Sequence, residues 1–235
     1  MILIKLKNRW ARFWMKWSGL NRFGRMACQI AGWFEPPYYG RVPLSRFGPK
    51  SYISPTAIIS HPKLRISKKC FIGDGVTIYQ DREGEDVFLS EQVHLHRGTI
   101  LQTGKGGTIA IGTDTHIQPR CQISAYKGSV CIGKRGEIAP NCAFYPYDHC
   151  FLPGASIRKQ PLKSKGDIII GDDVWLGFGV IVLDGVHIGN GAIVGAGSVV
   201  TKNIPENCIA VGNPAQVIKT RSESAKKDLL VPIQK

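Results

Sequence analysis

One feature of the sequence restricts its fold more than any other: an aliphatic residue returns every six positions over most of the chain. The unit reads aliphatic, small or Gly, any, any, small, any, and clear copies are IGDGVT from residue 72, IGTDTH from 111 and IGNGAI from 188. A period of six fits neither the two-residue period of a lone strand nor the 3.6-residue period of a helix. A short fixed repeat is typical of a solenoid, in which stacked copies bury one continuous core.

The leading aliphatic residues fall into triplets, and extra residues enter only between triplets, in insertions of five, four, three, twenty and no residues. A solenoid with three flat sides explains this, because all insertions then leave from one corner. We predict six full coils after a partial coil that Ile53 and Ile59 open. Strands about 4.8 Å apart would stack them into a prism roughly 30 Å long. The triplets begin at residues 66/72/78, 89/95/101, 111/117/123, 132/138/144, 170/176/182 and 188/194/200.

The fifth position of the unit is predicted to point into the core near a corner, where only a small side chain fits. Cys70, Cys121 and Cys142 occupy it, so we interpret them as core residues and not as ligands or nucleophiles. Seven cysteines without a Cys-x-x-Cys pair fit neither a disulfide framework nor a zinc knuckle. This pattern favours a reducing, cytoplasmic compartment.

Residues 1–34 differ from the repeat, with seven Lys or Arg, no acidic residue and four of the five tryptophans. We predict an amphipathic helix ending near Gly19 and a second helix over Asn21–Ile30. No stretch is long and apolar enough for an ordinary transmembrane helix, and a cleavable signal peptide is not expected. One predicted face is aromatic and the opposite face is basic: Leu3, Leu6, Trp10, Phe13, Trp14 and Trp17 against Lys5, Arg9, Arg12 and Lys16.

The formal net charge of +14 favours an anionic partner. We expect residues 1–34 to dock on an anionic membrane surface at the inner face of the cytoplasmic membrane. The alternative is that their aromatic residues cap the open end of the solenoid or pack between subunits. Residues 35–50 are predicted to be an irregular linker, 51–219 the solenoid domain, and 220–235 a polar tail with one helical turn.

The tandem hexapeptide resembles that of the hexapeptide-repeat acyltransferases, and segments 138–149 and 170–219 are similar to the galactoside and maltose O-acetyltransferase branch. The resemblance implies an all-β fold, a left-handed parallel β-helix with a helical N-terminal extension. It also implies a homotrimer with its active sites between subunits, and acetyl-CoA as donor to a sugar hydroxyl. The N-terminal segment favours a cell-envelope or exopolysaccharide glycan, lipid-linked or free. Neither a metal nor nucleic acid is expected.

The twenty-residue insertion after Phe144 contains Asp148 and His149, and long excursions from a rigid scaffold are usually functional. The resemblance assigns His149 as the general base. Its imidazole would take the proton of a sugar hydroxyl while that oxygen attacks the thioester, with no covalent intermediate. The acceptor-binding residues are predicted to be Gln118, Asn141 and Asp148. Gln118 departs from the Asn of relatives by one methylene.

The acetyl-CoA site is predicted from the same resemblance. Trp175 matches the family tryptophan. Phe178 matches the residue whose backbone N–H faces the thioester oxygen as an oxyanion donor, and Ala196 matches the small residue that lines the pantetheine channel. Thr201, Lys202 and Lys219 match positions near the nucleotide phosphates. Gln216 replaces an Arg that is frequent in relatives, so we expect one phosphate contact fewer in this chain.

Four other interpretations compete with this one. Zinc could bind to His94, His96, His116 and His149, as in the trimeric γ-class carbonic anhydrases, but the His-x-x-x-x-His pair is missing. Cys150 beside His149 could form an acyl-enzyme, although sequence neighbours rarely have that geometry. The remaining two are a streptogramin-type antibiotic O-acetyltransferase and a non-catalytic scaffold. We expect His94 and His96 to face solvent or border the acceptor groove.

Overall fold

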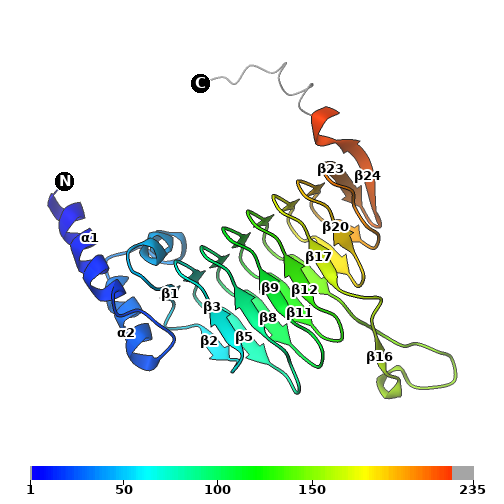
Figure 1. Cartoon of the computed structure of the whole chain (residues 1–235), viewed down its shortest axis with the longest axis horizontal. Coiled ribbons are helices and arrows are strands. Elements are labelled where there is room, and N and C mark those ends of the chain that lie inside the picture. Colours follow the sequence, from blue (N-terminus) through cyan, green and yellow to red (C-terminus); the bar gives the residue numbers. More distant parts are fainter. Residues whose placement is uncertain (1, 224–235) are drawn as a thin grey trace.

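The hexapeptide period folds into a left-handed parallel β-helix of about seven turns, as predicted (Figure 1). The structure is a computed structural model that describes residues 2–223. Each turn contributes one short strand to each of three sheets, here named A, B and C in chain order. The count agrees with the six predicted coils and the partial coil before them, which consists of β1 in sheet A and β2 in sheet B.

Sheet A has nine strands, of which only the last is antiparallel to its neighbour. Its members are β1 (Tyr52–Ile53), β4 (Phe71–Ile72), β7 (His94–Leu95), β10 (His116–Ile117), β13 (Glu137–Ile138), β18 (Trp175–Leu176), β21 (Ile193–Val194), β23 (Cys208–Gly212) and β24 (Ala215–Thr220). Sheet B contains β2 (Ile58–Ser60), β5 (Thr77–Gln80), β8 (Ile100–Thr103), β11 (Gln122–Ala125), β14 (Ala143–Tyr145), β19 (Ile181–Leu183) and β22 (Val199–Val200). Sheet C contains β3 (Leu64–Ile66), β6 (Val87–Leu89), β9 (Ile109–Ile111), β12 (Val130–Ile132), β17 (Ile168–Ile170) and β20 (His187–Ile188).

Identical positions of successive hexapeptides stack in register, so the core is a set of aliphatic columns. Ile117, for example, pairs with Leu95 on one side and Ile138 on the other, and all three are buried. The predicted inward fifth position is confirmed, because these small residues are all buried: Cys70, Val76, Val93, Thr99, Thr115, Cys121, Cys142, Val174, Val180, Val186, Ala192 and Ser198.

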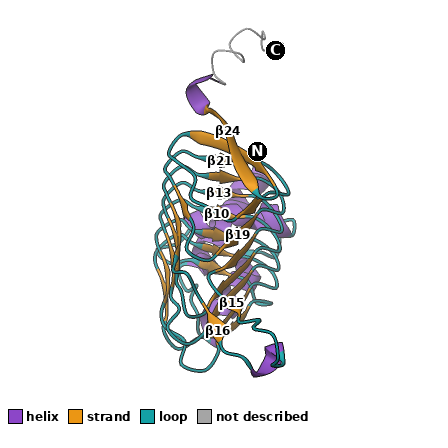
Figure 2. Cartoon of the chain, turned by 90° about the vertical axis from the view of Figure 1, so that its right-hand side faces the viewer, coloured by secondary structure: helices purple, strands orange, loops and turns teal. Residues whose placement is uncertain are grey.

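All insertions leave from the corner between sheets B and C, here the B/C corner, as the triplet spacing predicts. The longest one forms an antiparallel pair, β15 (Asp148–His149) with β16 (Leu162–Lys163), and a short 3₁₀ turn, η2 (Ile157–Lys159). We call residues 146–167 the excursion. It projects from the side of the prism near its C-terminal half (Figures 1 and 2).

The N-terminal residues form two helices, α1 (Ile2–Met15) and α2 (Arg22–Ala31). The first ends four residues before Gly19, while the second begins as predicted, with the Asn21 side chain accepting a hydrogen bond from the Gly24 N–H at 2.7 Å. Together they cover the N-terminal end of the β-helix (Figure 1). The Arg25 guanidinium donates to the carbonyls of Pro55 and Ala57, which belong to the first coil.

The prediction of an irregular linker over 35–50 is wrong for its central part. Residues Tyr38–Arg46 form a 3₁₀ helix, η1, which packs against β1 and β4 of sheet A. Its Leu44 joins a small second core with Met15, Cys28, Tyr52 and Phe71. The linker thus continues the covering of sheet A that the two helices begin.

The chain ends of the described region carry little further structure. Residues 221–223 are helical, and the rest of the predicted tail, from 224 on, lies outside the described residues. Within residues 2–223, neither α1 nor α2 combines the length and apolar character needed to cross a bilayer.

Candidate functional site

Four of the predicted site residues come just after strands of sheet A. They lie at the corner between sheets A and B, here the A/B corner. Gln118, Asn141, Phe178 and Ala196 belong to four consecutive coils. Backbone hydrogen bonds join the turns: the Asn141 N–H donates to the Pro119 carbonyl at 3.1 Å. The Gly197 N–H donates to the Phe178 carbonyl at 2.8 Å. The structure therefore brings these four residues to one corner of the prism, where Phe178 and Ala196 occupy equivalent positions of adjacent coils.

The turn geometry leaves the backbone N–H groups of Phe178 and Ala196 free at this corner. The N–H groups of Gly177 and Gly195 bond to the next coil, and those of Gly179 and Gly197 bond to the preceding coil. Between them, the N–H groups of Phe178 and Ala196 have no hydrogen-bond partner within residues 2–223. Both residues are exposed, so these donors can reach a ligand oxygen without breaking the stack.

Trp175 lies beside this corner on the outward face of sheet A. Its side chain is 53% exposed and stands between Glu137 and Ile193 in the stack. A large aromatic side chain that the core does not need offers a flat apolar surface to a ligand.

His149 lies elsewhere, on β15 in the excursion, which leaves from the B/C corner. The residue is exposed, and its backbone N–H donates to the Asp148 Oδ1 at 2.7 Å. No side chain among the described residues bonds to the imidazole. One protomer therefore does not bring His149 together with Trp175, Phe178 and Ala196, and Asp148 holds the local backbone.

The three residues expected near the phosphates are all exposed at the C-terminal end of the prism. Thr201 and Lys202 follow β22 of sheet B, while Lys219 lies on β24, opposite Ile209 at the edge of sheet A. Neither ammonium group forms an ion pair with any residue between 2 and 223. Both charges are thus available to an anion.

The structure adds one neighbour that the sequence did not indicate. The Tyr39 hydroxyl on η1 donates to the Gln118 Oε1 at 2.7 Å, across 79 residues of chain. The same helix covers His94 and His96, which are only 3% and 5% exposed, so the first of the two alternatives expected for them, that they face solvent, is wrong. The only signal for this cover was the aromatic pair at 38–39 in a segment without periodicity.

The covered histidines have unusual acid–base properties. Burial, reinforced by the nearby His116, lowers the pKa of His94 to about 3 and that of His96 to about 4. Both rings are therefore neutral near pH 7. His116 lies at the surface side of the stack, with Nδ1 3.4 Å from the Glu137 carboxylate.

The residues of the competing interpretations are placed as follows. No group of three or more His, Cys, Asp or Glu side chains in the described part of the chain is arranged to hold a metal ion. Cys150 is half-buried, and its backbone N–H donates to the Pro161 carbonyl at 3.0 Å. Burial raises the pKa of the Cys28 and Cys70 thiols, which fits their place in the cores.

Comparison with known proteins confirms the resemblance to hexapeptide-repeat transferases. Residues 167–202 match the family described as bacterial transferase hexapeptide (six repeats). The galactoside O-acetyltransferase of Lactococcus lactis is 38% identical over 95 residues, which are 40% of this chain and 45% of that protein. The chain spans about half the length of the curated relatives that it matches.

Among solved structures, AntD, an N-acyltransferase from Bacillus cereus in complex with dTDP and 3-hydroxybutyryl-CoA, is similar in fold. The superposition has a TM-score of 0.51 at 21% identity and covers 76% of this chain and 85% of AntD. At this identity the similarity is one of fold alone, and it agrees with the β-helix described above.

Proposed function

We propose that this hexapeptide-repeat chain is an acetyl-CoA-dependent O-acetyltransferase that modifies a sugar hydroxyl of a cell-envelope or exopolysaccharide glycan. The observation that carries the proposal is the presence of Gln118, Asn141, Phe178 and Ala196 at one corner of four consecutive coils, where the backbone N–H groups of Phe178 and Ala196 are unpaired within residues 2–223. The similarity to a galactoside O-acetyltransferase supports the choice of donor and of acceptor class.

In the proposed reaction the acceptor oxygen attacks the thioester carbonyl while His149 takes its proton. The negative charge on the carbonyl oxygen is stabilised by the Phe178 N–H. Collapse of this intermediate forms the acetyl ester and breaks the C–S bond. The imidazolium then returns its proton to the departing thiolate, so the base is regenerated without a covalent enzyme intermediate.

The positions of His149 and Phe178 in one protomer support a homotrimer. The base is in the excursion at the B/C corner, whereas the oxyanion donor is at the A/B corner. Three parallel prisms around a threefold axis can place the excursion of one protomer against the A/B corner of its neighbour. Each active site would then use residues of two chains.

The donor's phosphates are proposed to bind at the C-terminal end, near Thr201, Lys202 and Lys219. Two exposed ammonium groups without ion-pair partners in residues 2–223 suit the phosphate groups of a CoA thioester. Trp175 and Ala196 would line the path from there to the thioester.

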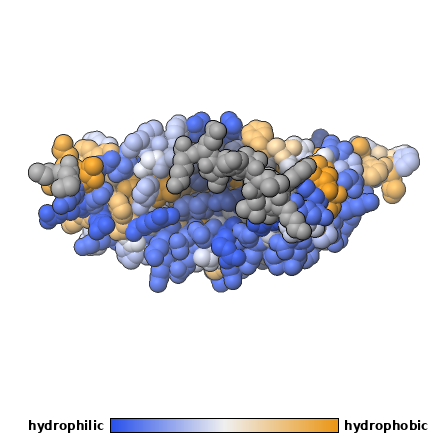
Figure 3. All heavy atoms as spheres, turned by 90° about the horizontal axis from the view of Figure 1, so that it is seen from above, coloured by the Kyte–Doolittle hydropathy of each residue, from blue (hydrophilic) through white to orange (hydrophobic). Residues whose placement is uncertain are grey.

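Residues 1–34 are proposed to hold the enzyme on the inner face of the cytoplasmic membrane, near lipid-linked or free glycans. The packing of α1 and α2 uses one side of the pair and leaves large apolar side chains exposed among basic ones (Figure 3). This combination is typical of helices that lie in a membrane interface. The exposed apolar side chains are Leu3, Ile4, Leu6, Trp10, Phe13, Trp17, Leu20, Phe23, Met26, Trp33 and Phe34.

A thiol-release assay tests the proposal. The purified chain is incubated with acetyl-CoA and a panel of free and lipid-linked glycans, and CoA formation is followed with a thiol reagent. We expect CoA release that depends on a glycan and falls about 10²–10⁴-fold in His149→Ala. His187→Ala, which removes another exposed histidine, is the control and should keep full activity.

Two results would contradict the proposal. Absence of acetyl-CoA binding would favour a non-catalytic scaffold, and turnover only with a streptogramin-type antibiotic would favour that alternative. Retention of most turnover in His149→Ala would remove the histidine from its proposed role. A silent Cys150→Ala variant is expected, because the direct transfer uses no acyl-cysteine.

A further inference from the structure

A cavity of about 250 Å³ lies under η1, at the N-terminal half of the A/B corner. Pockets for drug-sized ligands are larger, about 300–1,000 Å³, so this one suits a single small ring. It is built in part by η1, which the sequence did not predict to be ordered. Its lining residues are Tyr38, Tyr39, Phe71, Gly73, Asp74, His96, Arg97, Pro119 and Arg120.

From this cavity we infer the class of acceptor: an anionic sugar, whose ring lies under η1 and whose carboxylate or phosphate group meets Arg97 and Arg120. The inference rests on the proposed function for the reaction, but not for the binding itself. Four observations, on position, aromatic lining, charge and rigidity, support it.

The position of the cavity suits an acceptor. Asp74, Arg97 and Pro119 occupy the same corner position as Phe178 in three earlier coils. The Arg120 Nε donates to the Asn141 Oδ1 at 3.1 Å, so the cavity wall continues directly into the proposed site. From the coil of Arg120 to that of Phe178 there are two strand spacings, about 10 Å. A sugar in the cavity could therefore direct one hydroxyl towards the thioester.

The lining offers the two kinds of contact that a pyranose needs. Tyr38, Tyr39 and Phe71 present aromatic surface, against which the apolar C–H face of a sugar can pack. The ring centroids of His96 and Tyr39 are 4.9 Å apart. The buried imidazole of His96 can form a hydrogen bond to a sugar hydroxyl through a ring nitrogen. The amide of Gln118 is held at the rim by the Tyr39 hydroxyl.

The charge of the lining is positive. Arg97 and Arg120 are exposed, and neither forms an ion pair with an acidic side chain in residues 2–223. The Arg97 guanidinium lies 4.8 Å from the centre of the Tyr38 ring, which holds it at the cavity wall. A guanidinium can bind a carboxylate or a phosphate through two parallel hydrogen bonds, which a neutral sugar cannot offer.

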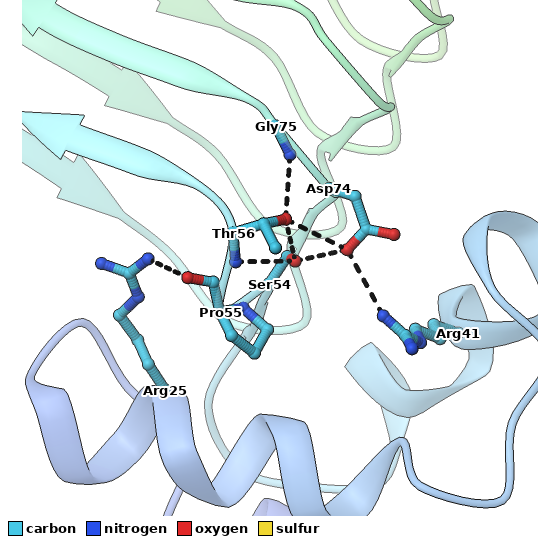
Figure 4. Close-up of polar contacts among 7 residues, drawn as sticks. All are labelled: Arg25, Arg41, Ser54, Pro55, Thr56, Asp74 and Gly75. Atoms are coloured by element: carbon cyan, nitrogen blue, oxygen red, sulfur yellow. Dashed lines mark hydrogen bonds and ion pairs between the residues drawn. The ribbon is translucent and has the colours of Figure 1, made fainter.

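The one acidic residue of the lining is already neutralised. The Asp74 carboxylate accepts hydrogen bonds from the Ser54 and Thr56 hydroxyls and forms an ion pair with Arg41 of η1 at 3.4 Å (Figure 4). The Thr56 hydroxyl also accepts the Gly75 N–H at 3.1 Å. This network fixes η1 to the first coils, so the cavity is held open in the absence of a ligand.

Binding can be measured without turnover. Calorimetric titrations would compare methyl glucuronide, methyl glucoside and glucose 6-phosphate on the purified chain. We expect at least one anionic sugar to bind about tenfold or more tightly than the neutral glucoside, and the double variant Arg97→Gln/Arg120→Gln to abolish this preference. Arg65→Gln, on the remote sheet C, is the matched control. Comparison of methyl glucuronide with glucose 6-phosphate shows whether a carboxylate or a phosphate is preferred.

Equal binding of neutral and anionic sugars, or a preference that survives the double variant, would overturn the inference. Tyr39→Phe provides a second variant that keeps the ring and should retain the charge preference while weakening binding of every sugar. Acetyl-CoA binding is measured in parallel. If a neutral glycan is acetylated efficiently, the proposed function stands and this inference fails. If anionic sugars bind with this preference but no sugar of any kind is acetylated, the inferred binding site stands and the proposed function fails.

Discussion

The imidazole rings of His94 and His116 lie face to face, with centroids 4.4 Å apart and an interplanar angle of 11°. They continue a ladder on sheet A in which Tyr52 stacks on Phe71 at 5.3 Å, and Phe71 meets His94 edge to face at 6.0 Å. Since η1 covers this ladder, His94 and His96 are held neutral inside a mixed aromatic cluster. This arrangement has a consequence for stability.

The first prediction is that acid destabilises the fold through these two histidines. The pKa of His94 is lowered to about 3 and that of His96 to about 4, chiefly by burial, with further lowering by the nearby His116 and, for His94, by His96 and Arg46. In the unfolded chain both titrate near pH 6.5, so the unfolded state binds more protons below that pH. The stability they contribute is present above pH 6.5 and is lost as the pH falls towards 4.

Thermal unfolding measured between pH 7.5 and 4.5 checks this. As the pH falls below about 6.5, each imidazole that stays neutral in the folded state should lower the free energy of unfolding by up to about 1.4 kcal/mol per pH unit. The variant His94→Phe should flatten the dependence, whereas His149→Ala, at an exposed site, should leave it unchanged. A wild-type profile that is flat down to pH 4.5 would contradict the burial of the two rings.

The second prediction is complementation between inactive variants. If each site uses His149 of one protomer and the Trp175 and Phe178 corner of its neighbour, His149→Ala and Trp175→Ala damage different partners of the same site. Chains unfolded and refolded together in equal amounts should recover about a quarter of the wild-type sites, because random mixing pairs two intact halves with that frequency. Mixed activity no higher than the mean of the separate variants, or a monomer by light scattering, would exclude a shared site.

The third prediction concerns donor binding. Lys202→Ala and Lys219→Ala should each raise the apparent KM for acetyl-CoA, and the difference from wild type should shrink as salt is added, because both supply exposed charges to phosphates. The KM for the sugar should change little. Lys68→Ala, another exposed lysine at the opposite end of the prism, is the control. An unchanged KM for acetyl-CoA in both variants would place the nucleotide elsewhere.

The fourth prediction is membrane binding by α1. Removal of residues 1–34 is an ambiguous test, because Met15 and Cys28 pack with Tyr52 and Phe71 in the second core. Their loss would expose this core as well as remove the helix. Substitution of the exposed Leu3, Phe13 and Trp17 by Ser should keep the thermal stability but abolish co-sedimentation with vesicles that contain an anionic lipid. Lys5→Gln should weaken the same binding by about 1 kcal/mol.

Two controls distinguish specific membrane binding by the N-terminal helix from nonspecific hydrophobic adsorption. Vesicles of neutral lipid should retain much less wild-type protein. The substitutions Phe88→Ser and Ile169→Ser, which remove exposed apolar side chains from sheet C, should leave the binding intact. Equal sedimentation of wild type and the α1 variant would mean that the exposed face of the helix meets another surface, such as a neighbouring subunit.

The β-helix could be predicted from the sequence because the hexapeptide repeat encodes it locally. Each leading aliphatic residue and each small fifth residue meets its own counterpart in the next coil, so the period alone specifies the burial of Ile117 or Cys121. The same logic located the insertions at one corner. The partial coil at Ile53 and Ile59 is also found, as β1 and β2.

The cover over sheet A could not be predicted, because no period links it to the repeat. The Tyr39 hydroxyl reaches Gln118 only in the folded chain, and η1 has no amphipathic pattern of its own. The repeat predicts that an outward position such as His94 is exposed, because it carries no information about a distant segment that packs on that position. For the site, sequence similarity proposes roles for His149 and Phe178, and the triplet register places them at different corners, but the repeat does not say how the two corners are brought together.

The excursion leaves sheet B after β14 and rejoins sheet C at β17 without disturbing the stack, since Phe144 still pairs with Val182, and Ile132 with Ile170. Loop length and strand register are therefore independent. We expect that the segment around His149 can be exchanged, shortened or lengthened while the β-helix keeps its melting temperature. Under the proposed function, evolution or design could then change the preferred acceptor by altering a single edge of the molecule.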